Sequence, residues 1–228
     1  MQRAADIAAE TPRVWRRERG DLSIPWDEAQ GHLAIVIDDV GRELHVFEQL
    51  LSLRFPLTFA VLPGSVFTSG VQVRLQADRR RHREVLLHLP MEPQDAALMR
   101  SDAELRETFL QITDDAQTLQ RKTQAALAAV PIAIGVNNHM GSRLTTDRGA
   151  MDAVMSELAR RRVFFLDSRT TADTVAMEAA TAAQVPTGSR HVFLDHEPGV
   201  AAIAHALALA AERASREPTI AIAHPTPE

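Results

Sequence analysis

The stretch that most constrains the fold of this chain is Leu33–Gly41, which reads LAIVIDDVG. It begins with an unbroken apolar run, Leu33 to Ile37, a pattern typical of a parallel strand that is buried on both faces. Asp38 and Asp39 follow at once, and then come Gly41 and a helical pattern. Strand, carboxylates, glycine and helix in this order predict a parallel α/β unit, in which functional residues collect where strands end.

The two adjacent aspartates need a compensating group. Neighbouring carboxylates repel one another and are costly to remove from water, so Asp38 and Asp39 indicate a nearby cation. The structural alternative is that Asp38 is a turn residue and that Asp39 caps the N-terminus of the following helix. This stretch alone leaves both interpretations open.

The composition restricts the class of protein. The 228 residues suffice for one large domain or two small ones, and 45% hydrophobic with 24% charged residues is ordinary for a soluble globular protein. A net charge of -5 argues against general nucleic-acid binding. The chain has no cysteine, which excludes disulfides, thiolate metal sites and cysteine nucleophiles. Any metal would therefore be held by His, Asp, Glu or carbonyl oxygen.

The chain also shows no membrane or export signal. No apolar run approaches the ~20 residues that cross a membrane. The start of the chain, MQRAADIAAETPRVWRRERG, lacks the apolar segment of a secretory signal peptide. Residues 1–31 are charged and lack a clear period, so we expect an N-terminal arm followed by one domain over residues 32–228.

Hydrophobic patterning predicts strands that alternate with helices through short connections. The predicted strands are 33–37, 57–62, 84–89, 132–136, 163–166, 191–194 and 219–223. The predicted helices include 43–53, 66–81, 147–161, 175–184 and 200–215. A further long helix is expected to start at a capping box of Ser101 and Glu104 and to end before Pro131. This alternation predicts an α/β fold.

The unusual polar residues follow the predicted strands. A lone histidine is more often structural than a ligand, but here six strands end in residues capable of acid–base or ligand chemistry: Asp38 and Asp39, His88, His139, Asp167, Asp195 and His196, and His224. In a barrel, parallel strands direct such residues to one rim. Strands two positions apart would bring them within ~10 Å. The pattern therefore predicts one shared site.

The residue types at this rim suit metal-assisted hydrolysis. One carboxylate and two imidazoles fit Zn²⁺ or a similar divalent ion and leave coordination positions open. Cleavage of an amide or ester then needs a base and an acid. Asp38, beside Asp39, is the candidate base, and His224 is the candidate acid for the leaving group. Asp167 or Asp195 would orient a histidine.

Other motifs are absent or ambiguous. The chain has no G-x-S-x-G elbow, Walker A loop or G-x-G-x-x-G, so serine hydrolase, P-loop and Rossmann functions lack support. Asn137 and Asn138 follow the fourth predicted strand, where they either shape a turn or bind sugar hydroxyls.

Seven segments together resemble the divergent polysaccharide deacetylase family, a branch of the polysaccharide (chitooligosaccharide-type) deacetylase superfamily. They are IVIDDVG, LTFAVLPGS, EVLLHLPMEP, GVNNHMGSRLT, FFLDSRTT, HVFLDHE and AIAHP, in this order between about Leu33 and Pro225. The resemblance implies a single-domain, distorted (β/α)7 TIM-like barrel. It also implies a metal-dependent hydrolase that removes acetyl groups, as amides or esters, from a cell-envelope polysaccharide.

The resemblance assigns roles to several residues. In the superfamily the first strand-end aspartate is the base and the second is a metal ligand, which implies these roles for Asp38 and Asp39. A second motif there has two histidines four apart. Here that pattern reads His88 and Glu92, so the second histidine is missing. His88 is implied as a ligand, and either Glu92 or His139 completes the site; we favour His139 because it restores the usual His, His, Asp set.

The resemblance also bears on the rest of the site. His224 matches the superfamily's general acid. The usual substrate-binding arginine motif is absent, so Arg143 or Arg169 is a candidate replacement, with Asn138 a further substrate-binding candidate. Zn²⁺ is the implied metal, with Co²⁺, Mn²⁺ and Ni²⁺ as alternatives, and a polysaccharide or oligosaccharide is the implied partner.

The family context adds expectations about place and length. We expect a periplasmic or extracytoplasmic bacterial protein, although this chain carries no signal peptide. Oligomeric state is not indicated. Family members usually continue past the AHP motif with a helix and a strand, so we expect a C-terminus shortened relative to them.

Two other functions compete with acetyl removal. The missing second histidine would suit a catalytically weak or inactive protein that binds carbohydrate or maintains the envelope on the same barrel. The same rim would also suit a metal hydrolase of another bond, such as a peptide amide or phosphoester.

Overall fold

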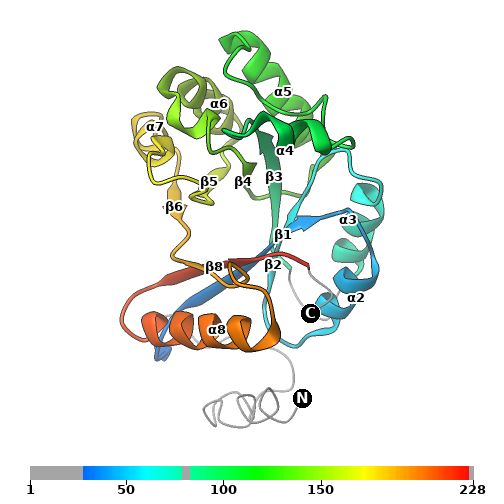
Figure 1. Ribbon diagram of the computed structural model, residues 1–228, viewed down its shortest axis with the longest axis vertical. Coiled ribbons are helices and arrows are strands. Elements are labelled where there is room, and N and C mark those ends of the chain that lie inside the picture. The colour runs from blue at the N-terminus through cyan, green and yellow to red at the C-terminus, as the bar shows by residue number, and fades with distance from the viewer. Residues whose placement is uncertain (1–27, 79–82, 226–228) are drawn as a thin grey trace.

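The computed structural model describes residues 28–78 and 83–225. The predicted N-terminal arm lies almost wholly outside this range, so it stays a prediction. Within the described residues, eight parallel strands form one curled sheet in the order β6-β5-β4-β3-β2-β1-β8-β7 (Figure 1). Their bounds are β1 (Leu33–Val40), β2 (Thr58–Val61), β3 (Val85–Met91), β4 (Gly135–Met140), β5 (Phe164–Asp167), β6 (Thr187–Ser189), β7 (Val192–Phe193) and β8 (Thr219–Ala223).

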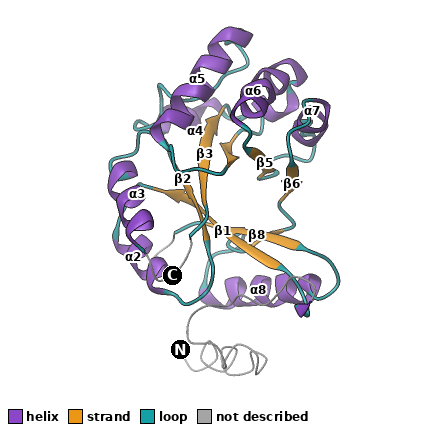
Figure 2. Ribbon diagram, turned by 180° about the vertical axis from the view of Figure 1, so that it is seen from behind, coloured by secondary structure: helices purple, strands orange, loops and turns teal. Residues whose placement is uncertain are grey.

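Helices cover the outer face of the curled sheet (Figure 2). They are α2 (His45–Ser52), α3 (Thr68–Ala77), α4 (Ala96–Ser101), α5 (Ala116–Ala129), the 3-10 turn η3 (Leu144–Thr146), α6 (Arg148–Arg161), α7 (Ala176–Ala182) and α8 (Val200–Ala214). This arrangement confirms the predicted distorted TIM-like barrel. Among the described helices, none has the length and apolar character that a membrane crossing requires.

Side-chain alternation divides the core into two layers. Successive residues of a strand point to opposite faces. One set packs with the helices, as Ile37, Phe59 and Leu87 do. The other set forms a small cluster of strand residues inside the curl, made of Val36, Ala60, Leu86, Leu166 and Ile222.

The inner layer predicts where the polar residues lie. Two residues beyond Val36, Leu86 and Ile222 along their strands stand Asp38, His88 and His224. Alternation therefore places these three side chains on the inner face, directly above the apolar cluster. Asn137 and His139 occupy the same face of β4, because Val136, which directly precedes Asn137, packs outward.

The long helix predicted from Ser101 is wrong. The Ser101 hydroxyl donates to Leu98 O at the C-terminus of α4, and the next helix starts only after Asp115, whose carboxylate accepts from Thr118 N. Residues 102–115 contain no regular helix. Their apolar positions fit the period of a helical face, but Leu105 and Phe109 pack with Leu62 in a separate small cluster.

Two strands also differ from the prediction. β4 extends to Met140 rather than ending at Val136, so Asn137 and Asn138 are strand residues and not turn formers. β6 was not predicted, because Thr187–Ser189 is short and carries no apolar alternation. It pairs with β5 through Leu166↔Gly188 and adds a strand to the seven expected.

Candidate metal centre and catalytic residues

A break in β1 brings both aspartates to one side. The register with β2 shifts between Ile37 and Val40, and Asp39 has a left-handed backbone with φ 55. In a regular strand Asp38 and Asp39 would point to opposite faces. The bulge removes that alternation, and aspartate tolerates the left-handed region better than most residues. Nε2 of His88 consequently lies 3.7 Å from Asp38 Oδ2 and 3.2 Å from Asp39 Oδ1.

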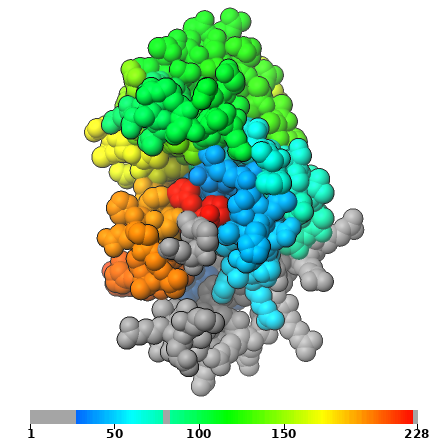
Figure 3. Space-filling model, turned by 45° about the vertical axis from the view of Figure 1, so that its right-hand side comes forward, coloured from blue at the N-terminus to red at the C-terminus, as the bar shows by residue number. Residues whose placement is uncertain are grey.

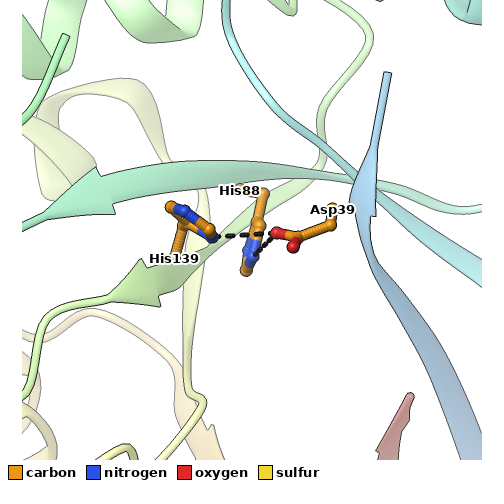
Figure 4. Close-up of side chains that lie close together, drawn as sticks. All are labelled: Asp39, His88 and His139. Carbon is orange, nitrogen blue, oxygen red and sulfur yellow. Dashed lines mark ion pairs between the residues drawn. The ribbon is translucent and has the colours of Figure 1, made fainter. Parts of the chain in front are cut away.

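Three side chains from three strands converge on one point. Asp39 from β1, His88 from β3 and His139 from β4 direct polar atoms toward one another (Figure 4). Asp39 Oδ1 lies 2.8 Å from His139 Nδ1, and one ligand atom from each residue lies within 4.8 Å of the others. His88 and His139 are buried, whereas the Asp39 side chain is partly exposed. The structure therefore groups the ligand set expected from the sequence.

The donor atoms fit a divalent ion. Asp39 Oδ1 is buried and has no hydrogen-bond partner among the described residues, because its short contacts to the two rings lack hydrogen-bond geometry. Ligand atoms at ~2 Å from a tetrahedral zinc are separated by about 3.3 Å, similar to these contacts. Burial alone would raise the pKa of Asp39, but His139 and His88 hold it well below its usual range. Asp39 is therefore ionised and ready to bind a cation.

A buried amide connects a candidate ligand, His88, to the candidate base, Asp38. Nδ1 of His88 lies 2.9 Å from Asn137 Oδ1, and Asn137 Nδ2 donates to Asp38 Oδ1 at 2.7 Å. Since the amide nitrogen faces the carboxylate, its oxygen accepts from His88 Nδ1–H. The Nε2 lone pair of His88 is thereby left for a metal. Burial raises the pKa of Asp38, and that shift suits a proton acceptor.

A second carboxylate lies behind the other histidine. Asp102 Oδ2 is 3.4 Å from His139 Nε2, and Arg42 holds Asp102 through two contacts of 2.6 and 3.2 Å. A carboxylate behind a metal-binding histidine fixes its ring orientation and increases its basicity. Burial alone would lower the pKa of His139, but Asp102 and Asp39 raise it to about 8.

His224 forms the third part of the site. It follows β8, and its backbone N–H and Nδ1 lie 2.7 and 3.1 Å from Asp195 Oδ2. Burial would lower the pKa of His224, but Asp195 and the charges of Asp39 and Asp38 raise it. Figure 3 shows the red residues at the C-terminal end of the described chain at the surface, beside blue residues from its N-terminal part. The Nδ1 contact leaves Nε2 of His224 available to a substrate.

Glu92 is engaged elsewhere. Its Oε1 accepts from Arg143 Nη1 at 2.9 Å, and its Oε2 accepts from Ile112 N at 2.8 Å. Its backbone oxygen accepts from the amides of Arg143 and Leu144. Glu92 therefore stabilises the loops after β3 and β4, and the potential metal cluster found among the described residues contains His139 in its place.

Two other predicted residues serve the backbone around β5. Asp167 accepts from Arg169 N and from Thr174 Oγ1, so both of its oxygens are engaged in a turn. The Asn138 amide accepts from Ser168 N and donates to Met140 O. Neither side chain points a spare group at the three-residue cluster, and their proposed roles at the site stay predictions.

Two contributors were missed by sequence reasoning. Asn137 was considered only as a turn former or sugar ligand, although its position two residues before His139 on one strand indicates the same face. Asp102 and its partner Arg42 left no comparable signal. Asp102 comes from the irregular stretch that resembled a helix, and only the fold brings it to His139.

The chain matches the family model described as divergent polysaccharide deacetylase over residues 35–228. It is 38% identical to the uncharacterized protein YibQ of Escherichia coli (strain K12) over 198 residues, 86% of this chain and 59% of that protein. An uncharacterized protein of Haemophilus influenzae is 33% identical over 87% of this chain and 68% of its own length. The chain thus spans about three fifths of its relative from E. coli.

Solved structures agree with the fold. The uncharacterized protein ATU2773 from Agrobacterium tumefaciens C58 superposes with a TM-score of 0.79 at 25% identity, over 89% of this chain and 81% of that one. A lactam utilization protein from Thermus thermophilus is similar in fold alone, with a TM-score of 0.52 at 14% identity over 85% and 90% of the two chains. The family match, the two sequence relatives and the converging strand ends lead to one conclusion: this chain belongs to the divergent polysaccharide deacetylase family.

Proposed function

We propose that this chain is a metal-dependent hydrolase that removes acetyl groups, bound as amides or esters, from a cell-envelope polysaccharide. The observation that carries the proposal is the convergence of Asp39, His88 and His139 beside the buried carboxylate of Asp38. The family match supports the reaction class. His139 also supplies the second imidazole that the motif around His88 lacks, which favours catalysis over carbohydrate binding alone.

The three converging residues would hold a divalent ion, with Zn²⁺ the best match to one carboxylate and two imidazoles. When bound, such an ion activates water and polarises the acetyl carbonyl. Asp39 supplies the negative charge, and the hydrogen bond to Asn137 orients His88. Asp102 lies 3.4 Å from His139 Nε2 without hydrogen-bond geometry and acts on that ring through its charge. The Zn²⁺ assignment rests on the chemistry of these donors.

Asp38 is placed to take a proton. Its Oδ2 lies 3.7 Å from His88 Nε2, so it borders the proposed metal site. The hydrogen bond from Asn137 fixes its other oxygen. Burial raises its pKa, which brings proton acceptance closer to neutral pH. As the water oxygen bonds to the acetyl carbon, its proton passes to Asp38.

His224 is placed to return a proton. The bond from the acetyl carbon to the sugar nitrogen or oxygen breaks, and the leaving atom takes a proton from Nε2 of His224. Asp195 holds the opposite ring nitrogen and stabilises the protonated ring. The products are the deacetylated sugar and acetic acid, which ionises to acetate. Asp38 then loses the proton it gained and His224 regains the one it gave, so atoms and charge balance over the cycle.

We further propose that the substrate, a cell-envelope polysaccharide, lies outside the cytoplasm. Fractionation of cells that express the full-length natural protein, with immunodetection in the periplasmic fraction, tests this placement. Recovery in the cytoplasmic fraction alone would contradict it.

Acetate release tests the reaction directly. The purified chain, loaded with Zn²⁺, Co²⁺, Mn²⁺ or Ni²⁺ in turn, is incubated with N-acetylated and O-acetylated polysaccharides, and free acetate is quantified. We expect release that depends on metal and falls at least ~100-fold in Asp38→Asn. A peptide amide and a phosphodiester in the same panel identify hydrolysis of another bond. Glycan binding without acetate release, equal in wild type and Asp38→Asn, would favour a non-catalytic function.

A further inference from the structure

A basic hollow lies beside the loop that follows β5. It has a volume of about 400 Å³ and is lined by Arg169, Thr170, Thr171, Ala172, Arg190 and His191. A hollow of about 470 Å³ between α6 and α7 contains none of the site residues. The basic hollow, by contrast, adjoins Ser168, whose Oγ accepts from Asn137 Nδ2 at 3.2 Å. One residue therefore separates the hollow from the amide that holds Asp38 and His88.

Arg190 is fixed in place before any ligand arrives. Its Nε donates to Ser168 O at 2.7 Å, and its Nη2 donates to Arg169 O at 2.8 Å. The guanidinium also stacks 4.9 Å from the ring centre of Phe193. Nη1 donates to no described residue. A rigid guanidinium with spare donors loses little entropy when it binds an anion.

The Arg169 backbone is held in a rare conformation. Its φ is 50, in the left-handed region that non-glycine residues seldom adopt. Asp167 Oδ1 accepts from Arg169 N, while Arg190 donates to Arg169 O, so contacts on both sides maintain this conformation. Strained backbone of this kind is typical of functional sites. The side chain is exposed and has no ion pair among the described residues.

Among the described residues, neither of the two arginines forms an ion pair, and the carboxylates of Asp167 and Asp38 act on Arg190 only at longer range. Most arginines of the described chain pair with a carboxylate, as Arg42 does with Asp102 and Arg143 with Glu92. Neither Arg169 nor Arg190 lies within ion-pair distance of a described carboxylate. After burial, the charge of Arg169 is the main reason that the pKa of Arg190 is lowered. Two guanidiniums held together in this way are stabilised by an anion.

His191 adds a neutral donor to the same wall. Its Nδ1 accepts from Ile220 N at 3.0 Å, so the ring proton is on Nε2. Burial lowers the pKa of His191, which keeps the ring neutral. No carboxylate of the described residues lines the hollow. The hollow therefore offers an anion the N–H donors of two guanidiniums and of one imidazole ring, and it contains no carboxylate that would repel the anion.

We propose that this hollow binds a negatively charged group of the substrate, a carboxylate or a phosphate, so that the enzyme acts on an acidic polysaccharide. This inference rests on the proposed function, because it assigns the hollow to the same glycan. Planar guanidiniums bind both carboxylate and phosphate with paired hydrogen bonds. The acidic group would sit on a sugar close to the one whose acetyl group is removed.

Calorimetric binding tests the inference without turnover. The probes are an oligogalacturonate, its methyl ester of equal length, and a phosphorylated maltooligosaccharide. We expect wild type to bind the oligogalacturonate or the phosphorylated probe at least tenfold more tightly than the neutral ester, and rising salt to reduce the difference. The stronger of the two acidic probes identifies carboxylate or phosphate as the preferred group.

Variants locate the effect. Arg169→Gln should reduce affinity for the preferred acidic probe about tenfold, whereas Arg169→Lys should keep most of it. Arg216→Gln is the matched control, because it removes an exposed arginine that pairs with Glu212 on α8. Arg190→Gln is a second test variant. Its melting temperature must be measured as well, because Arg190 also donates to the backbone oxygens of Ser168 and Arg169. If the carboxylate of the probe bound the metal instead of the hollow, its affinity would not change in Arg169→Gln.

The inference is overturned if wild type does not prefer either acidic probe, or if Arg169→Gln keeps the preference unchanged. Acetate release by a protein without that preference would reject the acidic substrate and leave the proposed reaction standing. Preference for the acidic probe without acetate release would support the anion-binding hollow and reject the proposed reaction.

Discussion

Asn137 accepts a hydrogen bond from Nδ1–H of His88 at 2.9 Å, and this contact sets which ring nitrogen of the histidine can bind a metal. The same amide donates to Asp38, so one side chain contacts both the proposed ligand and the proposed base. We predict that Asn137→Ala lowers zinc affinity about 10- to 100-fold, because His88 loses its orienting partner. Competition with a chromophoric chelator measures this change.

Asn138→Ala is the matched control for this prediction. Asn138 is an adjacent and equally buried residue of the same type, but it contacts Ser168 and Met140 rather than the ligands. We expect its loss to lower the melting temperature while zinc affinity changes only a few-fold. Equal losses of affinity in both variants would show that the effect comes from strand packing alone.

Asp102 is expected to support His139 in the same way. We predict that Asp102→Asn lowers zinc affinity about tenfold, because the neutral amide increases the basicity of His139 less than a carboxylate does. Glu104→Gln provides a control, since Glu104 lies 3.8 Å from the same Arg42 but does not contact His139. If both variants retain wild-type affinity, Asp102 serves only to hold Arg42.

Metal removal exposes the pH dependence of His139. Its pKa is raised from the ordinary 6.5 to about 8, so the protonated ring stabilises the metal-free fold. This contribution, about 2 kcal/mol at most, is fully present below pH 6.5 and is lost as the pH rises through 8. Urea unfolding across this pH range, with a chelator present, measures the difference in the free energy of unfolding between wild type and His139→Gln. A difference that does not change with pH would contradict the assignment.

Asp195 is expected to set the basic limit of activity through His224. The pKa of His224 is raised, so the ring stays protonated to a higher pH than an unperturbed histidine would. In Asp195→Asn the carboxylate is lost, and we predict that the basic limb of the pH profile of kcat/KM moves to lower pH. Asp173→Asn, an exposed surface substitution, should leave the profile in place. A fall in rate with no movement of the limb would indicate a structural role for Asp195.

Much of the candidate site could be predicted from the sequence, because the alternation of side chains along each strand depends on neighbouring residues alone. Each of three polar residues comes two positions after an inward-facing apolar residue: Asp38 after Val36, His88 after Leu86 and His224 after Ile222. The choice of His139 over Glu92 agrees with the geometry, in which Glu92 is held by Arg143.

The remaining features depend on tertiary structure. The left-handed backbone that turns Asp39 inward depends on the register shift between β1 and β2. Phe109 and its neighbours fit a helical period, and only their packing over Leu62 explains why no helix forms. Asp102 reaches His139 from that stretch, so a local pattern could not identify it.

Metal content tests the central claim most directly. Wild type, Asp39→Ala, His139→Ala and Glu92→Gln would be purified, dialysed against Zn²⁺ and then against buffer, and analysed by elemental mass spectrometry. We predict about one zinc per chain in wild type and in Glu92→Gln, and none retained in Asp39→Ala or His139→Ala. Wild type without bound metal, or zinc that survives in His139→Ala and is lost in Glu92→Gln, would contradict the proposed centre.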